Sequence, residues 1–293
     1  MASNSSPKPK LSTTTPYIPP ELCGRHSFTA YAQGYDVIHL CLRSLECHHQ
    51  RSIQTSSFCS LLIHSNNRRT NFFSFPFYDN DSIAKRAIKL ELPLRHRRSC
   101  TDRAGNCHGL LCIANNNKKD VALWNPSIQR FKRISFSLSE IMESEVARFG
   151  FGYDSATDDY KVVRIMEFRT SNGFCSSEVK VYGLKSNSWK RVQNLPSNHR
   201  YFGSYIHCLN SALHWLTNPD LGNTFIILTL DLVSEKYHEF PTPEDGVHAF
   251  PLPGLTALGG CLCFIVNNKA GSHVWAMKEC GVTKSWVMLF FLN

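Results

Sequence analysis

The sequence has few of the features that mark secreted or membrane-spanning proteins. Its longest apolar stretches, near 225–230, 258–266 and 286–292, fall well short of the roughly 20 residues needed to cross a bilayer. The first residues are polar and include no apolar segment, so a secretory signal is not expected. The 12 cysteines in 293 residues are far below the density of a disulfide scaffold. We therefore expect a protein of the cytoplasm or nucleus whose thiols stay reduced.

Acidic residues are scarce only in the first third of the chain. Residues 1–100 carry 13 basic and 6 acidic side chains, whereas residues 101–293 carry 19 and 17, within a total net charge of +9. A surface for nucleic acid or an anionic membrane would have to lie in the first hundred residues, because the rest is nearly neutral. We expect neither a nucleic acid nor a membrane as a partner.

The sequence also lacks the common catalytic and cofactor motifs. It contains no Gly-x-Ser-x-Gly element, P-loop, His-Glu-x-x-His helix or dinucleotide fingerprint. Cys41, Cys47, His48 and His49 follow none of the usual zinc-ligand spacings. We therefore expect a protein that is not an enzyme and that needs no metal or other cofactor.

Two short motifs have both a ligand-binding and a structural interpretation. Asp154, Asp158 and Asp159 form an acidic turn, in which calcium binding is the alternative to ordinary capping of backbone N–H groups. Gly150 and Gly152 lack the third glycine of a phosphate-binding loop and are interpreted as part of a β-turn. The structural interpretation is favoured for both motifs.

Two groups of cysteines are expected to be structural as well. Cys107, His108 and Cys112 belong to a strand-forming motif in which small or apolar residues fit between strands. Cys261 and Cys263 alternate along a predicted strand and share one face, which suits two buried thiols better than a redox pair.

What the chain does contain is an internal repeat. Each repeat has an apolar strand, an alternating strand, a polar turn and an aromatic residue that opens a further strand. The repeats occupy residues 109–134, 160–192, 211–240 and 260–290. The aromatic residues that follow the turns, separated by 58, 48 and 49 residues, are Phe131, Trp189, Tyr237 and Trp286. A period of about 50 residues is typical of a kelch-like blade, whose sheet must stack on its neighbours, and the large aromatic rings are expected to pack between blades.

Strands of an earlier blade are predicted upstream of these repeats. They are indicated by alternating apolar residues at Phe73, Phe75 and Phe77 and at Ile88, Leu90, Leu92 and Leu94. At the same period, residues 66–293 hold about four to five blades. The sequence thus predicts a mainly β protein with a kelch-like β-propeller, and we expect the ring to be incomplete at its C-terminal end because the chain stops inside the last blade.

Several motifs in register resemble the plant F-box-associated interaction domain. They are Cys107–Cys112, Leu123–Ser127, Gly150–Asp154 with Asp159–Val163, Val181–Tyr182 followed by Ser188–Trp189, and Leu213–Leu216. The resemblance covers about residues 66–293. It implies a kelch-like propeller that captures a target protein, attached to an N-terminal F-box that docks on the small linker subunit of a cullin-RING ubiquitin ligase.

The N-terminal region departs from the pattern of that family. Residues 1–17 are rich in Ser, Thr and Pro and predict a disordered tail. The next segment resembles the opening of an F-box, which implies contact with the linker subunit for Ile18, Pro19, Pro20, Glu21 and Leu22. No tryptophan precedes Trp124, and helical spacing survives only at Ile38, Cys41, Leu42 and Leu45 and at Phe58, Leu61 and Leu62. We interpret residues 18–65 as a degenerate F-box-like region, short and poorly formed but α-helical.

The resemblance leads to one main interpretation and one alternative. In the main interpretation, the chain is the substrate-recognition subunit of an SCF-type E3 ubiquitin ligase, in which the propeller holds an unknown target protein and other subunits carry the catalysis. In the alternative, the chain is a protein-binding propeller that has lost its F-box and therefore its ligase function.

Three connections that lie outside the repeat pattern are candidates for contact with the target. Propellers commonly bind partners through such loops, which a rigid scaffold positions. The candidate loops are 169–177, 194–205 and 241–253. The second contains His199, Arg200, Tyr201 and Phe202, an arginine and aromatic cluster of a kind enriched at interfaces. A solvated loop without a partner is the alternative for each.

Overall fold

The structure, a computed structural model, describes residues 28–32, 35–40, 60–65, 71–76, 88–94, 101–115, 120–126, 128–136, 146–169, 175–196, 200–219, 224–243, 253–268 and 271–292. Within these ranges every secondary-structure element is a β-strand except the one-turn 3-10 helix η4 (Thr283–Ser285). No helix in the described part of the chain has the length and apolar character needed to cross a membrane. The prediction of a mainly β fold is confirmed.

Four antiparallel sheets of four strands repeat one order, in which each strand pairs with the next along the chain. Blade 1 consists of β6 (Thr101–Cys107), β7 (Leu110–Asn115), β8 (Val121–Asn125) and β9 (Arg130–Ile134). Blade 2 consists of β10 (Val146–Asp154), β11 (Asp159–Arg169), β12 (Cys175–Gly183) and β13 (Ser188–Arg191). Blade 3 consists of β14 (Arg200–Leu209), β15 (Ala212–Asn218), β16 (Ile226–Asp231) and β17 (Tyr237–Pro241). Blade 4 consists of β18 (Gly254–Leu258), β19 (Cys261–Asn268), β20 (Gly271–Met277) and β21 (Trp286–Leu292).

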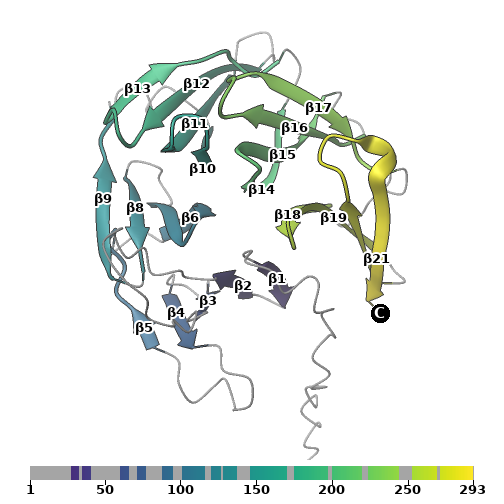
Figure 1. Ribbon diagram of the computed structural model, residues 1–293, viewed down its shortest axis with the longest axis horizontal. Coiled ribbons are helices and arrows are strands. Elements are labelled where there is room, and N and C mark those ends of the chain that lie inside the picture. Colours follow the sequence, from purple (N-terminus) through teal and green to yellow (C-terminus); the bar gives the residue numbers. More distant parts are fainter. Residues whose placement is uncertain are drawn as a thin grey trace, which may run out of the picture.

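The blades are arranged around a common centre, with the first strand of each blade inside and the fourth outside (Figure 1). β10 contacts both β6 and β14, and β14 contacts β18. Glycines make this close approach possible, because an added Cβ at Gly150 would lie 2.8 Å from Leu213 Cδ1 and one at Gly152 would lie 2.8 Å from Cys208 Sγ. Both glycines therefore lie inside β10 and face blade 3. Our interpretation of them as part of a β-turn is wrong, because alternation along a strand directs both positions to the neighbouring blade.

A further antiparallel sheet of five strands lies between blade 4 and blade 1 (Figure 1). Its strands are β1 (Phe28–Ala32), β2 (Tyr35–Leu40), β3 (Ser60–Ser65), β4 (Asn71–Pro76) and β5 (Ile88–Leu90). β1 contacts β18 of blade 4. On the other side, the ring of Phe72 meets that of Trp124 in blade 1 edge-on, with 5.9 Å between centroids. The predicted earlier strands are confirmed as β4 and β5.

The prediction of helical structure before residue 66 is wrong wherever the structure describes it. Ile38 lies in β2, and Leu61 and Leu62 lie in β3. β3 pairs with β4 in a register that sets Ile63 opposite Phe73. A few apolar residues at helical spacing cover only one or two turns, and so short a helix is less stable than strands paired over this length. The other residues of these two sets, and the segment 18–22, lie outside the described residues.

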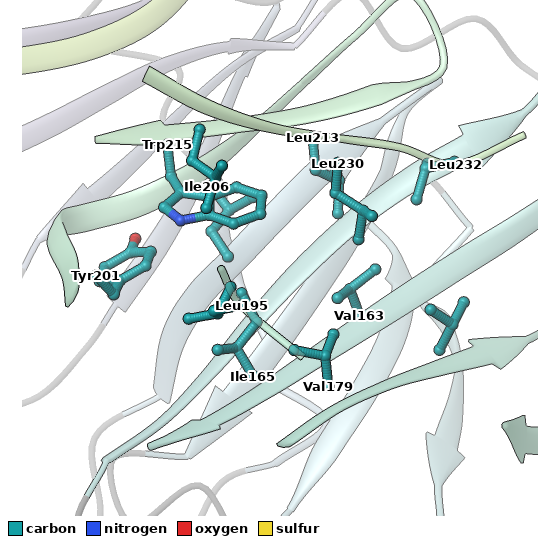
Figure 2. Packing of buried hydrophobic residues seen from close by; sticks show 12 residues of the cluster. Val163, Ile165, Val179, Leu195, Tyr201, Ile206, Leu213, Trp215, Leu230 and Leu232 are labelled. Atoms are coloured by element: carbon teal, nitrogen blue, oxygen red, sulfur yellow. The ribbon is translucent and has the colours of Figure 1, made fainter. Parts of the chain in front are cut away.

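Adjacent blades bury apolar side chains against each other. Between blades 2 and 3, the fully buried Trp215 belongs to one apolar cluster with Val163, Ile165 and Val179 (Figure 2). Removing a ring of this size from water is among the largest single contributions to a core. The propeller is therefore a rigid scaffold for the segments that connect its strands.

Candidate functional site

The order of the strands gives the ring two different faces. Because neighbouring strands are antiparallel, the hairpins from first to second and from third to fourth strand emerge on one side, here called the turn face. The connections from second to third strand, and from each blade to the next, emerge on the other side, here called the connection face. The three candidate loops, 169–177, 194–205 and 241–253, all belong to the connection face. Topology thus gathers on one side three segments that are far apart in sequence.

The four residues predicted to contact a partner lie at the end of the middle loop. His199 is outside the described residues, whereas Arg200, Tyr201 and Phe202 open β14. The Tyr201 side chain is buried beside Leu195 and Trp215 (Figure 2). Tyr201 is thus part of the core in this structure, and a direct role for its neighbours stays a prediction.

The contacts of Tyr201 hold the loop 194–205 at its second end. The Arg148 guanidinium carbon lies 4.8 Å from the centroid of the Tyr201 ring, a cation–π distance. The backbone N–H of Tyr201 donates to Glu167 Oε1 at 3.2 Å. At the first end, the backbone N–H of Leu195 donates to Ser177 Oγ at 2.9 Å, which ties this loop to the strand that follows the loop 169–177. Two candidate loops are therefore anchored to one another at their bases.

On the turn face, the acidic turn is held by hydrogen bonds within the protein. Asp154 Oδ1 accepts from the backbone N–H of Ala156 at 2.9 Å, and its Oδ2 accepts from Thr157 Oγ1 at 2.7 Å. Burial opposes ionisation of Asp154, but the bonds from Lys161 and from this turn outweigh it and lower its pKa to about 2. Asp159 accepts from the backbone N–H of Lys185 at 3.0 Å. Within the part of the chain that the structure describes, no group of acidic, His or Cys side chains could hold a metal ion.

A buried lysine connects blade 2 to blade 3. Lys161 Nζ lies 2.7 Å from Asp154 Oδ2 and donates to the carbonyl oxygen of Leu232 at 2.7 Å. It also lies 3.6 Å from Glu235 Oε1, in the hairpin between β16 and β17 of blade 3. The charge of Lys161 is thus compensated by a carboxylate of its own blade and by polar groups of the next.

A second buried cation, Arg164, was not found by sequence reasoning. Its guanidinium lies 5.4 Å from the Phe136 ring centroid and 5.2 Å from that of Trp189, and its Nη2 lies 3.7 Å from Glu178 Oε1. The only signal in the sequence is a basic residue between the apolar residues Val163 and Ile165 of β11. Its partners come from other parts of the chain, so the strand alone cannot reveal them.

Two of the described cysteines lie in the interior of the fold, whereas Cys280 is exposed. Cys112 and Cys263 are buried, and burial raises the pKa of Cys263 to about 12. A hydrogen bond with Cys208 raises the pKa of Cys107. Free thiols among the described residues are Cys107, Cys112, Cys208, Cys261, Cys263 and Cys280. Cys41, Cys47 and the adjacent histidines lie outside the described residues.

Three of the four aromatic residues that open the outer strands connect neighbouring blades, as predicted. Trp189 Nε1 donates to the carbonyl oxygen of Ser135 at 2.8 Å, at the end of the preceding blade. Tyr237 and Trp286 repeat this arrangement, donating at 3.1 Å to the carbonyl of residue 193 and at 3.3 Å to that of residue 241. Phe131 occupies the same position in blade 1 but has no polar atom to donate. The repeat thus includes one inter-blade hydrogen bond that blade 1 lacks.

Sequentially stacked four-stranded blades, closed against each other by recurring aromatic contacts, define this fold as a β-propeller. The chain belongs to the F-box associated beta propeller domain family, whose family model matches residues 54–291.

Several curated relatives come from Arabidopsis thaliana. F-box protein CPR1 is 31% identical over 270 residues, covering 84% of this chain and 63% of that protein. F-box/kelch-repeat protein At3g23880 is 34% identical over 193 residues, covering 63% of this chain and 51% of that protein. F-box protein At4g22390 is 31% identical over 212 residues, covering 65% of this chain and 52% of that protein. The chain therefore spans between about half and two thirds of the length of these relatives.

Proposed function

We propose that this chain is the substrate-recognition part of an SCF-type ubiquitin ligase. Its propeller would bind a target protein, and other subunits would transfer ubiquitin to it. The observation that carries the proposal is the family propeller itself, with three candidate segments gathered on its connection face. The relatives named F-box proteins support the link to a ligase. We expect this activity in the cytoplasm or nucleus.

The proposed contribution of this chain is binding and positioning, with no chemical step of its own. Holding a target beside the ligase raises the effective concentration of its lysines near the transferring subunit. On the turn face, Asp154 and Lys161 already pair with each other, and Lys161 donates to the carbonyl of Leu232. A rigid ring with its variable segments on one side suits such a role, because the scaffold fixes where the bound protein lies.

Co-purification with the small linker subunit of the ligase tests the proposal. The full chain and a family member with an intact F-box would be expressed separately with the same linker subunit. Retention of the linker subunit by both chains supports a ligase function. Retention by the family member alone would exclude that function for this chain.

A specific observation favours the second candidate, a protein-binding propeller without ligase function. β2 and β3 lie within the F-box-like region 18–65, yet they pair in one sheet with β4. That sheet packs on blade 1 through Phe72 and Trp124. Residues expected to form a separate docking module thus contribute strands to the propeller. Capture of a target without the linker subunit would identify this second function.

A further inference from the structure

The outer strand of blade 1, β9, has a surface unlike those of the other blades. It lies at the outer edge of its sheet (Figure 1) and carries Arg130, Lys132 and Arg133, all exposed. No acidic residue occurs among the described residues 128–136. β9 is thus an edge strand on which every charged side chain is positive.

The charges on β9 lack the compensation that the corresponding strand of blade 2 has. On β13, Lys190 Nζ lies 2.6 Å from Glu235 Oε1, and Arg191 Nη1 lies 3.8 Å from Glu178 Oε2. On β9, Arg133 Nη2 donates at 3.5 Å to a backbone carbonyl, that of residue 93, and Lys132 Nζ lies 6.0 Å from the Tyr182 ring. No carboxylate of the described residues lies within ion-pair distance of the three cations of β9. The positive charges of β9 are therefore not neutralised by carboxylates of the described residues and can attract an anionic partner.

An apolar anchor lies in the middle of this basic strand. Phe131 takes the position at which Trp189, Tyr237 and Trp286 donate to the preceding blade, and its side chain is 49% exposed. Ile128, in the turn just before β9, is 61% exposed. Aromatic residues surrounded by arginine are typical of binding hot spots. Because side chains alternate along a strand, Phe131 shares one face of β9 with Arg133, whereas Arg130 and Lys132 lie on the other face. The position where the repeat loses its inter-blade hydrogen bond thus presents an exposed aromatic ring on a strand with basic side chains on both faces.

The chemistry of this edge selects among possible partners. A strand edge can accept another strand, but positive side chains repel a second copy of the same strand and any basic segment. An extended acidic peptide would add by main-chain hydrogen bonds, while its carboxylates face the basic residues of β9 and an apolar side chain packs on Phe131. We propose that β9 is a docking strand for an extended acidic segment of a target protein. This inference rests on the proposed function for the origin of the segment, although the peptide contact itself requires no ligase.

Fluorescence anisotropy on the full chain tests this inference. The probe is a labelled Glu-Val-Glu-Leu-Glu-Val-Glu peptide, and the control probe has Gln in place of every Glu. We expect the acidic probe to bind at about 50 mM salt and to lose most of its affinity at about 300 mM, because exposed charge contacts are screened. Equal binding of the two probes would overturn the proposal.

Two sets of variants locate the contact. Arg130→Gln, Lys132→Gln and Arg133→Gln combined should weaken binding of the acidic probe by about ten-fold or more, since three attractive charges are removed. The matched control, Lys190→Gln with Arg191→Gln on β13, should change it by less than about two-fold, because those charges are already paired. Equal losses in the two sets would place the contact elsewhere. Circular dichroism confirms that both variants fold.

A third variant and a competitor separate a peptide site from a general polyanion site. Phe131→Ser should weaken the acidic probe several-fold while leaving its salt dependence unchanged, because it removes only the apolar contact. In a competition assay, a short DNA duplex is added at equal charge concentration. If the duplex displaces the acidic probe and Phe131→Ser has no effect, the partner of β9 is a nucleic acid and the peptide proposal is wrong. Binding of the acidic probe by a chain that does not retain the linker subunit would support docking on β9 while excluding the ligase function.

Discussion

The buried histidine of blade 3 predicts a specific loss of stability in mild acid. His214 lies in β15, where its Nδ1 is 2.7 Å from Thr229 Oγ1 and its Nε2 is 3.3 Å from the carbonyl oxygen of Leu209. A carbonyl can only accept, so a neutral ring with its proton on Nε2 satisfies both contacts. Burial disfavours the charged ring and lowers the pKa of His214 to about 4, although the bond to Leu209 opposes this.

The direction and size of the effect follow from linkage. The pKa of a histidine in the unfolded chain is about 6.5, so the unfolded state takes up the proton first as the pH falls. Folding free energy is therefore lost progressively between pH 6.5 and pH 4, and retained fully above that window. A separation of about 2.5 pKa units, at about 1.4 kcal/mol per unit, sets the loss from His214 at roughly 3 kcal/mol. Asp154, whose pKa is about 2, contributes only at lower pH.

Urea unfolding followed by tryptophan fluorescence at several values between pH 7 and pH 4 measures this loss. His214→Gln keeps a donor and an acceptor but cannot take up a proton. From pH 6.5 to pH 4, the free energy of unfolding of this variant should therefore fall by roughly 3 kcal/mol less than that of the unmodified chain. His238→Gln on β17 removes an exposed histidine and is the matched control for the loss of an imidazole as such. The reasoning is refuted if His214→Gln and the unmodified chain lose stability in parallel.

Two further substitutions test how the blades are joined, each by urea unfolding at pH 7. Trp189→Phe keeps a ring but removes the donor to the carbonyl of Ser135, so it should destabilise the protein by about 1 kcal/mol, and a loss near zero would show that this bond adds nothing to its packing. Lys161→Met leaves the buried carboxylate of Asp154 without its cation and should lower the free energy of unfolding by about 3 kcal/mol. Adding Asp154→Asn should recover part of that loss. A double variant less stable than Lys161→Met alone would contradict the pairing.

The repeated part of the fold could be predicted because each blade contains its own local signals. Alternation along Val179 and Val181, followed by a polar turn and Trp189, is readable within one hairpin, and β12 and β13 form there. The region before residue 66 has no such redundancy. Its apolar residues at Ile38 and at Leu61 fit either period, and pairing with β4, set by residues farther along the chain, decides in favour of strands.

The candidate site could be predicted at the level of segments but not of individual side chains. The three candidate loops were identifiable because they interrupt the repeat, and topology places them on one face. The sequence around Tyr201 looks the same whether this residue lies in a loop or in the core. In the fold, its ring contacts Arg148 and its backbone N–H donates to Glu167, and both partners belong to blade 2. Lys161 finds its carbonyl partner in Leu232, 71 residues away, so only the arrangement of the blades reveals the contact.

The two faces of the ring differ in how strongly the backbone constrains their sequence, and this difference bears on where target specificity can evolve. On the turn face, His108, Asp158, Asn187 and Asn210 have φ between 47° and 51°, a region that most side chains avoid. Asp231 repeats the arrangement of Asp154 by accepting from the backbone N–H groups of residues 233 and 234. Substitution there disturbs the hairpins that define the blades. Among the described residues, every non-glycine residue with positive φ lies in a turn-face hairpin. In the proposed function, substitutions in the described parts of the connection face and on β9 would therefore alter which protein is bound while the hairpins stay intact.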